Sequence, residues 1–423
     1  MREMKDSGVE WIGTVPKNWN IFRNKNAFDC SKDIVGEKSS VVQLLSLTTK
    51  GIKKKDITNT EGKLPETFDT YQMVRKNDLV MCLFDLDMSA VFSGISPYSG
   101  MISPAYRILT CTERIYPKYA DYWFQYVSHG RKFNHYAKNI RYTLGIDEFF
   151  ALPMLFPPVT EQRKIADYLD DKCSKIDAII AKQEKIIEKL KEYRLALILE
   201  TVTKGTNENV AYKECNVEWM KKIPAQWDIA TIARIATVVR GASPRPAGDP
   251  RYFNGHDVPW ITVAEVTRDV GKYIYETESF LTSDGAKLSR FVEEGTLLLS
   301  NSGATLGVPK ITKIAGCIND GSVAFYNLKI DKEYLFYVLA SRTIELRKQM
   351  QGYGQPNLNT TIVKAIEVPI PTREEQKRIV VFLDQKCESI DKQVACREQL
   401  ISKLTEYKKS LIYECVTGKK EII

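Results

Sequence analysis

Residues 161–205 read EQRKIADYLDDKCSKIDAIIAKQEKIIEKLKEYRLALILETVTKG, and residues 375–419 repeat this stretch as EQKRIVVFLDQKCESIDKQVACREQLISKLTEYKKSLIYECVTGK. The second copy lies 214 positions after the first and aligns with it without a gap. Solenoid repeats have periods of about 20–50 residues, so a repeat this widely spaced indicates a duplicated domain. The chain is therefore expected to consist of two related halves.

Each copy is predicted to form one long helix. Neither copy has Pro or an internal Gly, and both are rich in Lys, Glu, Leu and Ile, which favour helix. Thr160 and Thr372 are the candidate N-caps. Roughly 42 helical residues at about 1.5 Å each predict a rod of about 63 Å.

Apolar residues recur along both copies at alternating steps of four and three, which is the a/d seam of a coiled coil. The seam consists of Leu169, Cys173, Ile176, Ile180, Ile187, Leu190 and Leu197 in the first copy, and of Leu383, Cys387, Ile390, Val394, Ile401, Leu404 and Leu411 in the second. Periodicity by itself also permits a generic dimerisation coil. Two matched seams in one chain favour an internal antiparallel pair, which would relate the halves by a pseudo-two-fold.

Composition predicts a globular protein of the cytosol. The chain has 423 residues, of which 43% are hydrophobic, and its net charge of +8 permits nucleic-acid binding without requiring it. The nine cysteines form no CxxC pair and there is no signal peptide, so we expect free thiols in a reducing, cytoplasmic compartment. No apolar run approaches the ~18 residues of a membrane span.

A second repeat opens each half: residues 7–21 read SGVEWIGTVPKNWNI and residues 215–229 read CNVEWMKKIPAQWDI. The matching positions are Trp11 and Trp219, Pro16 and Pro224, and Trp19 and Trp227. Trp and Pro at fixed places indicate a structural clasp that docks on the preceding helix. Base stacking by these tryptophans is the alternative.

The regions between the repeats differ strongly in sequence and are predicted to be globular. Short β-like runs separated by Gly, Ser, Asn and Asp turns indicate strands. In the first region the expected strands are Val41–Leu47, Asp78–Leu83 and Ala105–Leu109, with a helix at Pro117–Tyr136. In the second they are Val258–Val263, Thr296–Leu299, Gly307–Ile311 and Ser322–Tyr326, with a helix at Glu333–Gln351.

The sequence contains no convincing catalytic constellation. Its three histidines, His129, His135 and His256, have no spacing for a zinc site or a triad. It also lacks a GxxxxGK[ST] phosphate loop and the Asn/Asp-Pro-Pro-aromatic tetrapeptide of amino-methylating enzymes. A chain this large without a catalytic set is expected to be a recognition or scaffold subunit, with no metal site.

Recognition chemistry is concentrated in polar loops. DNA readers use Arg and Lys for phosphates and guanine edges, and Asn and Gln for adenine edges. In the second region three loops are expected to converge on one face, and their candidate DNA-binding residues are Arg240, Ser243, Arg245, Arg251, Tyr252, Asn301, Ser302, Thr305, Tyr353, Gln355 and Asn357. In the first region the candidates are Lys53, Lys54 and Lys55, which suit phosphate better than bases, and Arg141, Tyr142 and Thr143. An ordinary solvated loop is the alternative for each.

These motifs together resemble the specificity (S) subunits of type I restriction–modification systems, over essentially the whole chain. The resemblance rests on PPVTEQ at residues 157–162, on PIP at residues 369–371 before Glu375-Gln376, and on the Trp-x-x-x-x-Pro opening of each half. The second region also carries family-like Gly241–Pro244, Pro259–Ile261, Asn301–Gly303 and Gly354-Gln355. The first region departs at the matching places, where it has Asp85–Ser89 and Arg141-Tyr142.

The resemblance implies an α+β fold with two target recognition domains, each followed by a long helix of an antiparallel coiled coil. The expected domains are residues 1–159 (first recognition domain), 160–205 (first helix), 206–371 (second recognition domain) and 372–423 (second helix and tail). Each recognition domain would read one half of a bipartite, asymmetric site in double-stranded DNA, and the helices would set the spacer.

The resemblance also implies that the chain is not itself an enzyme and binds no cofactor. Two DNA methyltransferase (modification) subunits would dock on the helices and supply S-adenosylmethionine and adenine methylation. A restriction subunit using ATP and Mg²⁺ would be a further partner. Two alternatives from the residues stay open: a DNA-modifying enzyme in its own right, and a coiled-coil adaptor that does not touch DNA.

Overall fold

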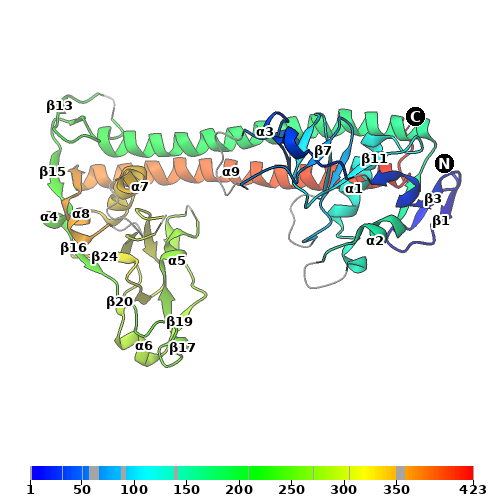
Figure 1. Ribbon diagram of the computed structural model, residues 1–423. Helices are drawn as coiled ribbons and strands as arrows, with labels where there is room; N and C mark the ends of the chain where they lie inside the picture. Colours follow the sequence, from blue (N-terminus) through cyan, green and yellow to red (C-terminus); the bar gives the residue numbers. More distant parts are fainter. Residues whose placement is uncertain are drawn as a thin grey trace. The chain divides into compact units, whose positions relative to one another are not determined.

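The computed structural model describes residues 2–422 except residues 31, 50, 57–65, 87–91, 138–141, 208, 270, 304 and 349–357. The chain divides into two compact units (Figure 1). Unit 1 contains Met1–Gln183 and Glu398–Ile423, and unit 2 contains Glu184–Arg397. Both combine mostly antiparallel strands with separate helices, so the fold is α+β. No helix in the described ranges is long and apolar enough to cross a membrane.

The two predicted long helices are confirmed as α3 (Val159–Lys204) and α9 (Arg373–Val416). Within each unit they pair antiparallel, as shown by cross-helix ion pairs. In unit 1 the Lys408 Nζ lies 2.7 Å from the Asp177 Oδ2. In unit 2 the Arg194 Nε lies 3.2 Å from the Asp391 Oδ1. These residues are repeat equivalents, so the same contact forms once in each unit with the helices exchanging roles.

The predicted seam forms the buried face of both helices. Its fully buried members are Leu169, Cys173, Ile176, Ile187, Leu383, Cys387, Ile390 and Leu411, and its half-buried members are Ile180, Leu190, Leu197, Val394, Ile401 and Leu404. The seam prediction misses the helix ends, where Ile198, Val202, Ile412 and Val416 are completely buried. Globular elements enclose these ends, and burial there extends beyond the stripe that faces the partner helix.

Only one of the two predicted helix caps is correct. α9 begins at Arg373 after Thr372, whose Oγ1 accepts a hydrogen bond from the Glu375 N–H at 3.3 Å. The Glu375 Oε2 accepts the Thr372 N–H in return at 3.1 Å, which completes a capping box. α3 begins at Val159, so Thr160 lies inside the first turn and the prediction that it is the cap is wrong.

In unit 1, a four-stranded sheet has the order β4-β11-β8-β9, and the other strands form antiparallel pairs. The sheet consists of β4 (Phe28–Cys30), β11 (Arg107–Cys111), β8 (Leu79–Met81) and β9 (Ser93–Ile95). The pairs are β1 (Met4–Asp6) with β2 (Thr14–Pro16), β3 (Asn20–Arg23) with β12 (Pro153–Phe156), β5 (Leu45–Thr48) with β6 (Gly51–Lys54), and β7 (Gln72–Val74) with β10 (Gly100–Ile102). The helices are α1 (Pro117–His129) and α2 (Ile146–Ala151), with short 3-10 turns at Asn24–Asn26, Gly36–Ser40 and Asn134–Tyr136.

Two predictions in unit 1 extend too far. The strand expected from Val41 begins only at Leu45, because Val41 caps the 3-10 turn Gly36–Ser40 and the Val42 N–H still donates to the Lys38 carbonyl of that turn. The helix expected to reach Tyr136 ends at His129, where Gly130 follows and Arg131 adopts a positive φ of 47°. A residue in that left-handed region cannot continue an α-helix.

Unit 2 contains two larger sheets, with orders β16-β24-β21-β22-β18 and β19-β17-β23-β20. Their strands are β16 (Thr237–Arg240), β24 (Ser322–Tyr326), β21 (Leu297–Ser300), β22 (Pro309–Thr312), β18 (Tyr273–Ile274), β19 (Phe280–Leu281), β17 (Phe253–Ile261), β23 (Gly316–Ile318) and β20 (Arg290–Val292). The outer pairs are β13 (Tyr212–Glu214) with β14 (Lys222–Pro224) and β15 (Asp228–Thr231) with β25 (Glu367–Ile370). The helices are α4 (Ile232–Ile235), α5 (Val263–Thr267), α6 (Ser283–Lys287), α7 (Lys332–Lys348) and α8 (Thr360–Ala365).

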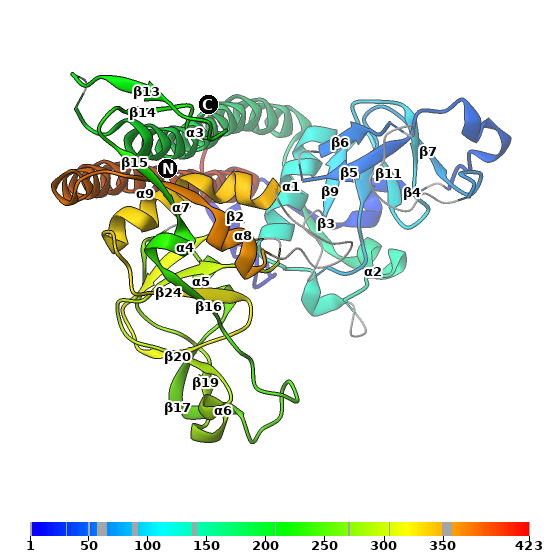
Figure 2. The same cartoon turned by 90° about the vertical axis from the view of Figure 1, so that its left-hand side faces the viewer.

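The four strands and the helix predicted in unit 2 are all confirmed, with strand ends that move by a few residues. The last three residues of the expected helix, 349–351, lie outside the described residues. The expected strand from Val258 is the last part of the longer β17, and the expected helix from Glu333 is α7. Figure 2 and Figure 1 both place β17, β19 and α6 at the end of this unit that is opposite to α7.

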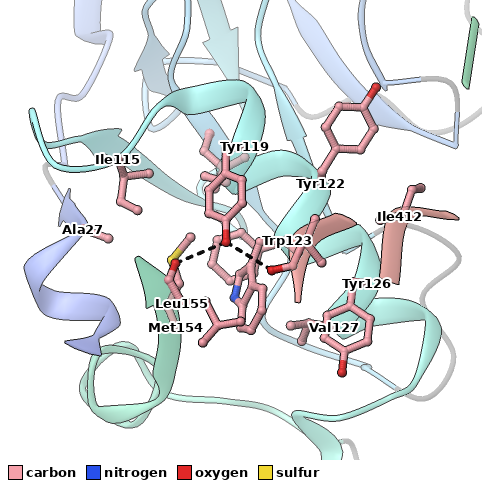
Figure 3. Packing of buried hydrophobic residues seen from close by; sticks show 14 of the residues in the cluster. Ala27, Ile115, Tyr119, Tyr122, Trp123, Tyr126, Val127, Met154, Leu155 and Ile412 are labelled. Atoms are coloured by element: carbon pink, nitrogen blue, oxygen red, sulfur yellow. Dashed lines mark hydrogen bonds between the residues drawn. The ribbon is translucent and has the colours of Figure 1, made fainter. Parts of the chain in front are cut away.

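A buried tyrosine fastens each globular part to the long helices. The Tyr119 hydroxyl of α1 lies 3.3 Å from the carbonyl oxygens of Leu155 and Val416 (Figure 3). In unit 2 the Tyr334 hydroxyl of α7 donates to the Pro369 carbonyl at 2.9 Å and lies 3.4 Å from that of Val202. Both side chains are fully buried, so the same junction is built twice.

The glutamine of the repeated Glu-Gln pair has a structural role in both units. The Gln162 side chain is fully buried, donates to the Pro157 carbonyl at 2.8 Å and accepts the Tyr116 N–H at 2.7 Å. Gln376 donates to the Pro371 carbonyl at 2.9 Å and accepts the Asp331 N–H at 2.7 Å. Each glutamine thus joins the start of its long helix to the segment that leads into α1 or α7.

The Trp and Pro positions form the predicted clasp. Trp19 is fully buried, and its indole N–H donates to the Glu161 Oε2 at 2.9 Å. A Cβ on Gly418, just after α9, would lie 2.4 Å from Pro16. In unit 2 the ring of Trp227 packs against Gly205 at the end of α3, the helix that precedes it. Because Trp19 and Trp227 are buried, base stacking by these two rings is excluded in this conformation.

Candidate nucleic-acid interface

The tight turn Asn319–Gly321 between β23 and β24 organises the candidate DNA-reading loops of unit 2. The loop that follows β16 is laid directly on this turn: the Gly241 N–H donates to the Ser322 carbonyl at 2.9 Å, and the Ala242 N–H donates to that of Ile318 at 3.1 Å. Gly241 is required here, because a Cβ would lie 2.1 Å from the Asn319 carbonyl oxygen.

Three predicted DNA-binding residues meet at Asp320. The Ser243 hydroxyl donates to its Oδ1 at 2.6 Å, and the Arg240 Nε donates to its main-chain carbonyl at 2.8 Å. The Arg245 Nη2 lies 3.5 Å from its Oδ2, and the Arg245 side chain is 70% exposed. A carboxylate therefore orders a basic, solvent-facing loop.

The predicted loop at residues 301–305 reaches the same turn. The Asn301 N–H donates to the Gly321 carbonyl at 2.9 Å, and a Cβ on Gly321 would lie 2.8 Å from the Ser302 Oγ. The expected convergence of these two loops is confirmed. The Asn301 side chain is fully buried, however, so in this conformation its amide is not presented to DNA, whereas Thr305 is exposed.

The third predicted loop contains Tyr353, Gln355 and Asn357, which lie outside the described residues. The first described residue after it, Leu358, donates its N–H to the Asn301 carbonyl at 2.7 Å. Leu358 therefore adjoins Asn301 at the start of the loop at residues 301–305.

Arg251 and Tyr252 belong to a different part of the unit. The Arg251 guanidinium pairs with Asp249 at 2.7 Å and lies 5.4 Å from the Tyr252 ring centroid. Hydrogen bonds from Arg251 hold the pKa of Asp249 below its usual range. The Tyr252 carbonyl accepts the Thr282 N–H at the start of α6, so this pair lies on α6 rather than on the turn Asn319–Gly321.

The candidate residues of unit 1 are less concentrated. Lys53 and Lys54 are exposed at the end of β6, Lys55 is half-buried, and the Lys54 ammonium lies 4.9 Å from the Tyr98 ring centroid. Lys54 and Lys55 line an open groove of about 460 Å³ together with residues 40–44 and 56. A row of lysines beside such a groove suits phosphate contact.

The second group in unit 1 is only partly described. Arg141 lies outside the described residues. Tyr142 is 40% exposed and its carbonyl accepts the Leu86 N–H at 3.4 Å, while Thr143 is half-buried. The structure does not bring this group together with Lys53–Lys55 through any contact among the described residues.

Over the described ranges, no group of three or more His, Cys, Asp or Glu side chains could hold a metal ion. His129 is exposed at the end of α1, and partial desolvation of its imidazole together with the nearby Lys409 and Lys408 lowers its pKa.

Sequence reasoning missed the most connected residue of the interface, Asp320. Residues 319–321 read Asn-Asp-Gly, a strong turn signal that was available in the sequence. Nothing in the sequence indicates that residues 240–245, about 80 positions upstream, fold onto this turn. Asp170 and Asp384 were also missed: each accepts a tyrosine hydroxyl, from Tyr122 and Tyr337 respectively, where α1 or α7 meets its long helix.

The amino-acid sequence is similar to those of known proteins. A family model described as the type I restriction modification DNA specificity domain matches residues 224–406. The chain is 26% identical over 282 residues to the type I restriction enzyme MjaVIII specificity subunit of Methanocaldococcus jannaschii, covering 62% of this chain and 61% of that protein. It is 32% identical over 170 residues to the MjaIX specificity subunit of the same organism, covering 38% of each. The matches thus span less than two thirds of the length of these relatives.

The fold is shared with a solved structure. A chain from a structure concerned with complex assembly and conformational transition of the type I R-M system aligns with a TM-score of 0.71 at 14% identity, covering 96% of this chain and 99% of that one. At this identity the likeness shows the fold alone. In sequence, the chain is thus similar to type I restriction–modification specificity subunits, through the family model over residues 224–406 and through the two curated relatives.

Proposed function

We propose that the chain is the sequence-specific DNA recognition subunit of a type I restriction–modification complex. Each globular part reads one half of a bipartite site, and because the two parts differ in sequence the site is asymmetric. The observation that carries this proposal is the twice-built frame of long helix, buried tyrosine and Trp-Pro clasp, which supports two unlike globular parts. A repeated helical frame that carries two globular parts of different sequence suits the recognition of two different DNA sequences.

The chain itself performs no chemistry in this proposal. S-adenosylmethionine is bound by modification subunits that methylate adenine, and ATP with Mg²⁺ is bound by a restriction subunit where one joins the complex. Double-stranded DNA is the ligand of the reading loops. A cytoplasmic location is part of this proposal, because the reading loops must reach cellular DNA.

The long helices offer two equivalent docking places for the modification subunits. Tyr193 of α3 in unit 2 and Tyr407 of α9 in unit 1 are repeat equivalents, and each is 56% exposed. Seven residues before them lie Ile186 and Leu400, on the same helix face. This apolar stripe lies next to the a/d seam, and an apolar face of that width is typical of a helix with more than one helical neighbour.

Each unit would therefore bind one amphipathic helix of a modification subunit, and the repetition predicts two copies. Tyr193→Glu or Tyr407→Glu should leave one bound copy, and the double variant none, as measured by native mass spectrometry of the purified complex. Val381→Glu is a matched control, because Val381 is also 56% exposed on α9 but corresponds to Asp167 in the first copy. Two bound copies in the double variant would refute this docking surface.

The recognition role is tested by co-expressing the chain with its methyltransferase subunit in a host that lacks adenine methylation, and mapping methyladenine across the genome. The expected result is one split, asymmetric motif that disappears when this chain is omitted. Methylation that is absent, or unchanged without this chain, while the complex still assembles would instead favour a coiled-coil adaptor. Binding of S-adenosylmethionine by the isolated chain would favour an enzyme.

A further inference from the structure

We infer that Asp320 is a positioning residue that sets how Arg245 and Ser243 meet the DNA, and thereby fixes specificity at one position of the half-site read by unit 2. The inference rests on the proposed function and adds to it a residue that bears the specificity. Asp320 itself needs no contact with a base for this role, because it acts through the side chains that it holds.

The contacts at Asp320 restrain both side chains of the loop. The Ser243 hydroxyl donates to the Asp320 Oδ1 at 2.6 Å and lies 3.4 Å from the Asp320 main-chain N–H. Its rotamer is therefore fixed by a donor and an acceptor from the same residue. The second carboxylate oxygen, Oδ2, lies 3.5 Å from the Arg245 Nη2.

The contact leaves Arg245 able to bind DNA. It uses one nitrogen of a guanidinium that has five N–H donors, and the side chain is 70% exposed. Bidentate recognition of guanine requires the guanidinium plane to be held in a definite orientation. An exposed ion pair of this kind adds little to folding stability. The contribution of the Asp320 carboxylate is therefore to orient the Arg245 guanidinium.

Asp320 is itself held rigidly, because its turn is anchored on both sides. Arg240 binds its main-chain carbonyl at 2.8 Å, and the next residue, Gly321, accepts the Asn301 N–H at 2.9 Å. The turn therefore links both reading loops. Because the main chain of the turn is held in place, a change of the Asp320 side chain acts directly on Arg245.

Two buried polar atoms next to Asp320 lack a hydrogen-bond partner. The Asn319 Oδ1 and the Ser322 Oγ are buried and have no hydrogen-bond partner within the described part of the chain. Buried polar atoms without partners are costly and uncommon, and they deserve a functional explanation. Their clustering on either side of Asp320 fits a turn whose polar groups are arranged for a ligand rather than for stability alone.

The test is Asp320→Asn in the full chain, co-expressed with the methyltransferase subunit, with methyladenine mapped genome-wide. Asparagine keeps the size and removes the charge. We expect one position of the unit 2 half-site to accept a second base at a frequency at least tenfold above that of the native complex, with the other half-site and the spacer unchanged. Asp284→Asn is the matched control, because Asp284 carries the same charge in unit 2 but pairs with Lys287 on α6.

Two further variants separate positioning from folding. Ser243→Ala removes the other partner of the carboxylate and should relax the same position, even if Asp320→Asn fails to fold. In a chain that already carries Arg245→Ala and Ser243→Ala, adding Asp320→Asn should relax specificity no further, since Asp320 acts through these two side chains. An unchanged motif, or a uniform loss of methylation at all sequences by folded protein, would overturn the inference. The lack of any motif with the native chain would instead overturn the proposed function.

Discussion

Deletion of residues 182–188 from α3 together with residues 396–402 from α9 would shorten the helix pair by one heptad without disturbing its register. Along the sequence, the deleted segments fall between the residues of the Asp177–Lys408 pair in unit 1 and those of the Arg194–Asp391 pair in unit 2, two pairs that follow the same antiparallel register. Because seven residues are removed from each helix, both pairs can form as before and the remaining seam positions stay in phase.

The size of the effect follows from helix geometry. Seven residues at about 1.5 Å each remove about 10.5 Å. At about 3.4 Å per base pair, this distance corresponds to about three base pairs of DNA. If the helices set the spacer, the optimum spacer should become about three base pairs shorter while both half-sites keep their sequences. Methylation at the new optimum should be weaker, because three base pairs also rotate one half-site by about 100° at roughly 10.5 base pairs per turn.

The assay is methylation of a plasmid library that carries both half-sites with graded spacers, in cells that express the variant and the methyltransferase subunit. Insertion of one heptad at the same two places is the complementary variant and should lengthen the optimum. If the native spacer remains the optimum for a variant that folds and assembles, the helices do not measure the site.

Three other predictions test separate parts of the structure. Arg245→Ala should cost about 1–3 kcal/mol of discrimination and relax one half-site position in the methylation map, whereas a uniform loss at all sequences would assign Arg245 to a phosphate. Tyr334→Phe leaves the Pro369 carbonyl without its donor and should lower the free energy of unfolding in urea by about 1–2 kcal/mol, while Tyr193→Phe on the surface should leave it unchanged. Exchange of Phe22–Val159 for the corresponding region of another such subunit should change one half-site only; a change in both would show that the two regions do not read independently.

The repeated frame could be predicted from the sequence because its signals are local. Heptad spacing fixes which side of a helix is apolar, so the periodicity alone correctly predicts the buried seam around Leu169 and Leu383. The limits of this reasoning also have local causes. The cap at Thr160 was wrong because α3 begins one residue earlier, and α1 stopped short because Arg131 takes a left-handed conformation.

The duplication, the two long helices, the divergence of the globular parts and the residue types suited to DNA are all evident from the amino-acid sequence. Which of those residues meet is evident only in the folded chain. Asp320 joins Arg240, Ser243 and Arg245 only because β23 and β24 bring their connecting turn against a loop about 80 positions upstream. In the folded chain the Asn301 side chain is also buried, whereas the Arg245 side chain is exposed. Strand pairing and loop packing depend on contacts between distant segments, and no periodicity along the chain encodes them.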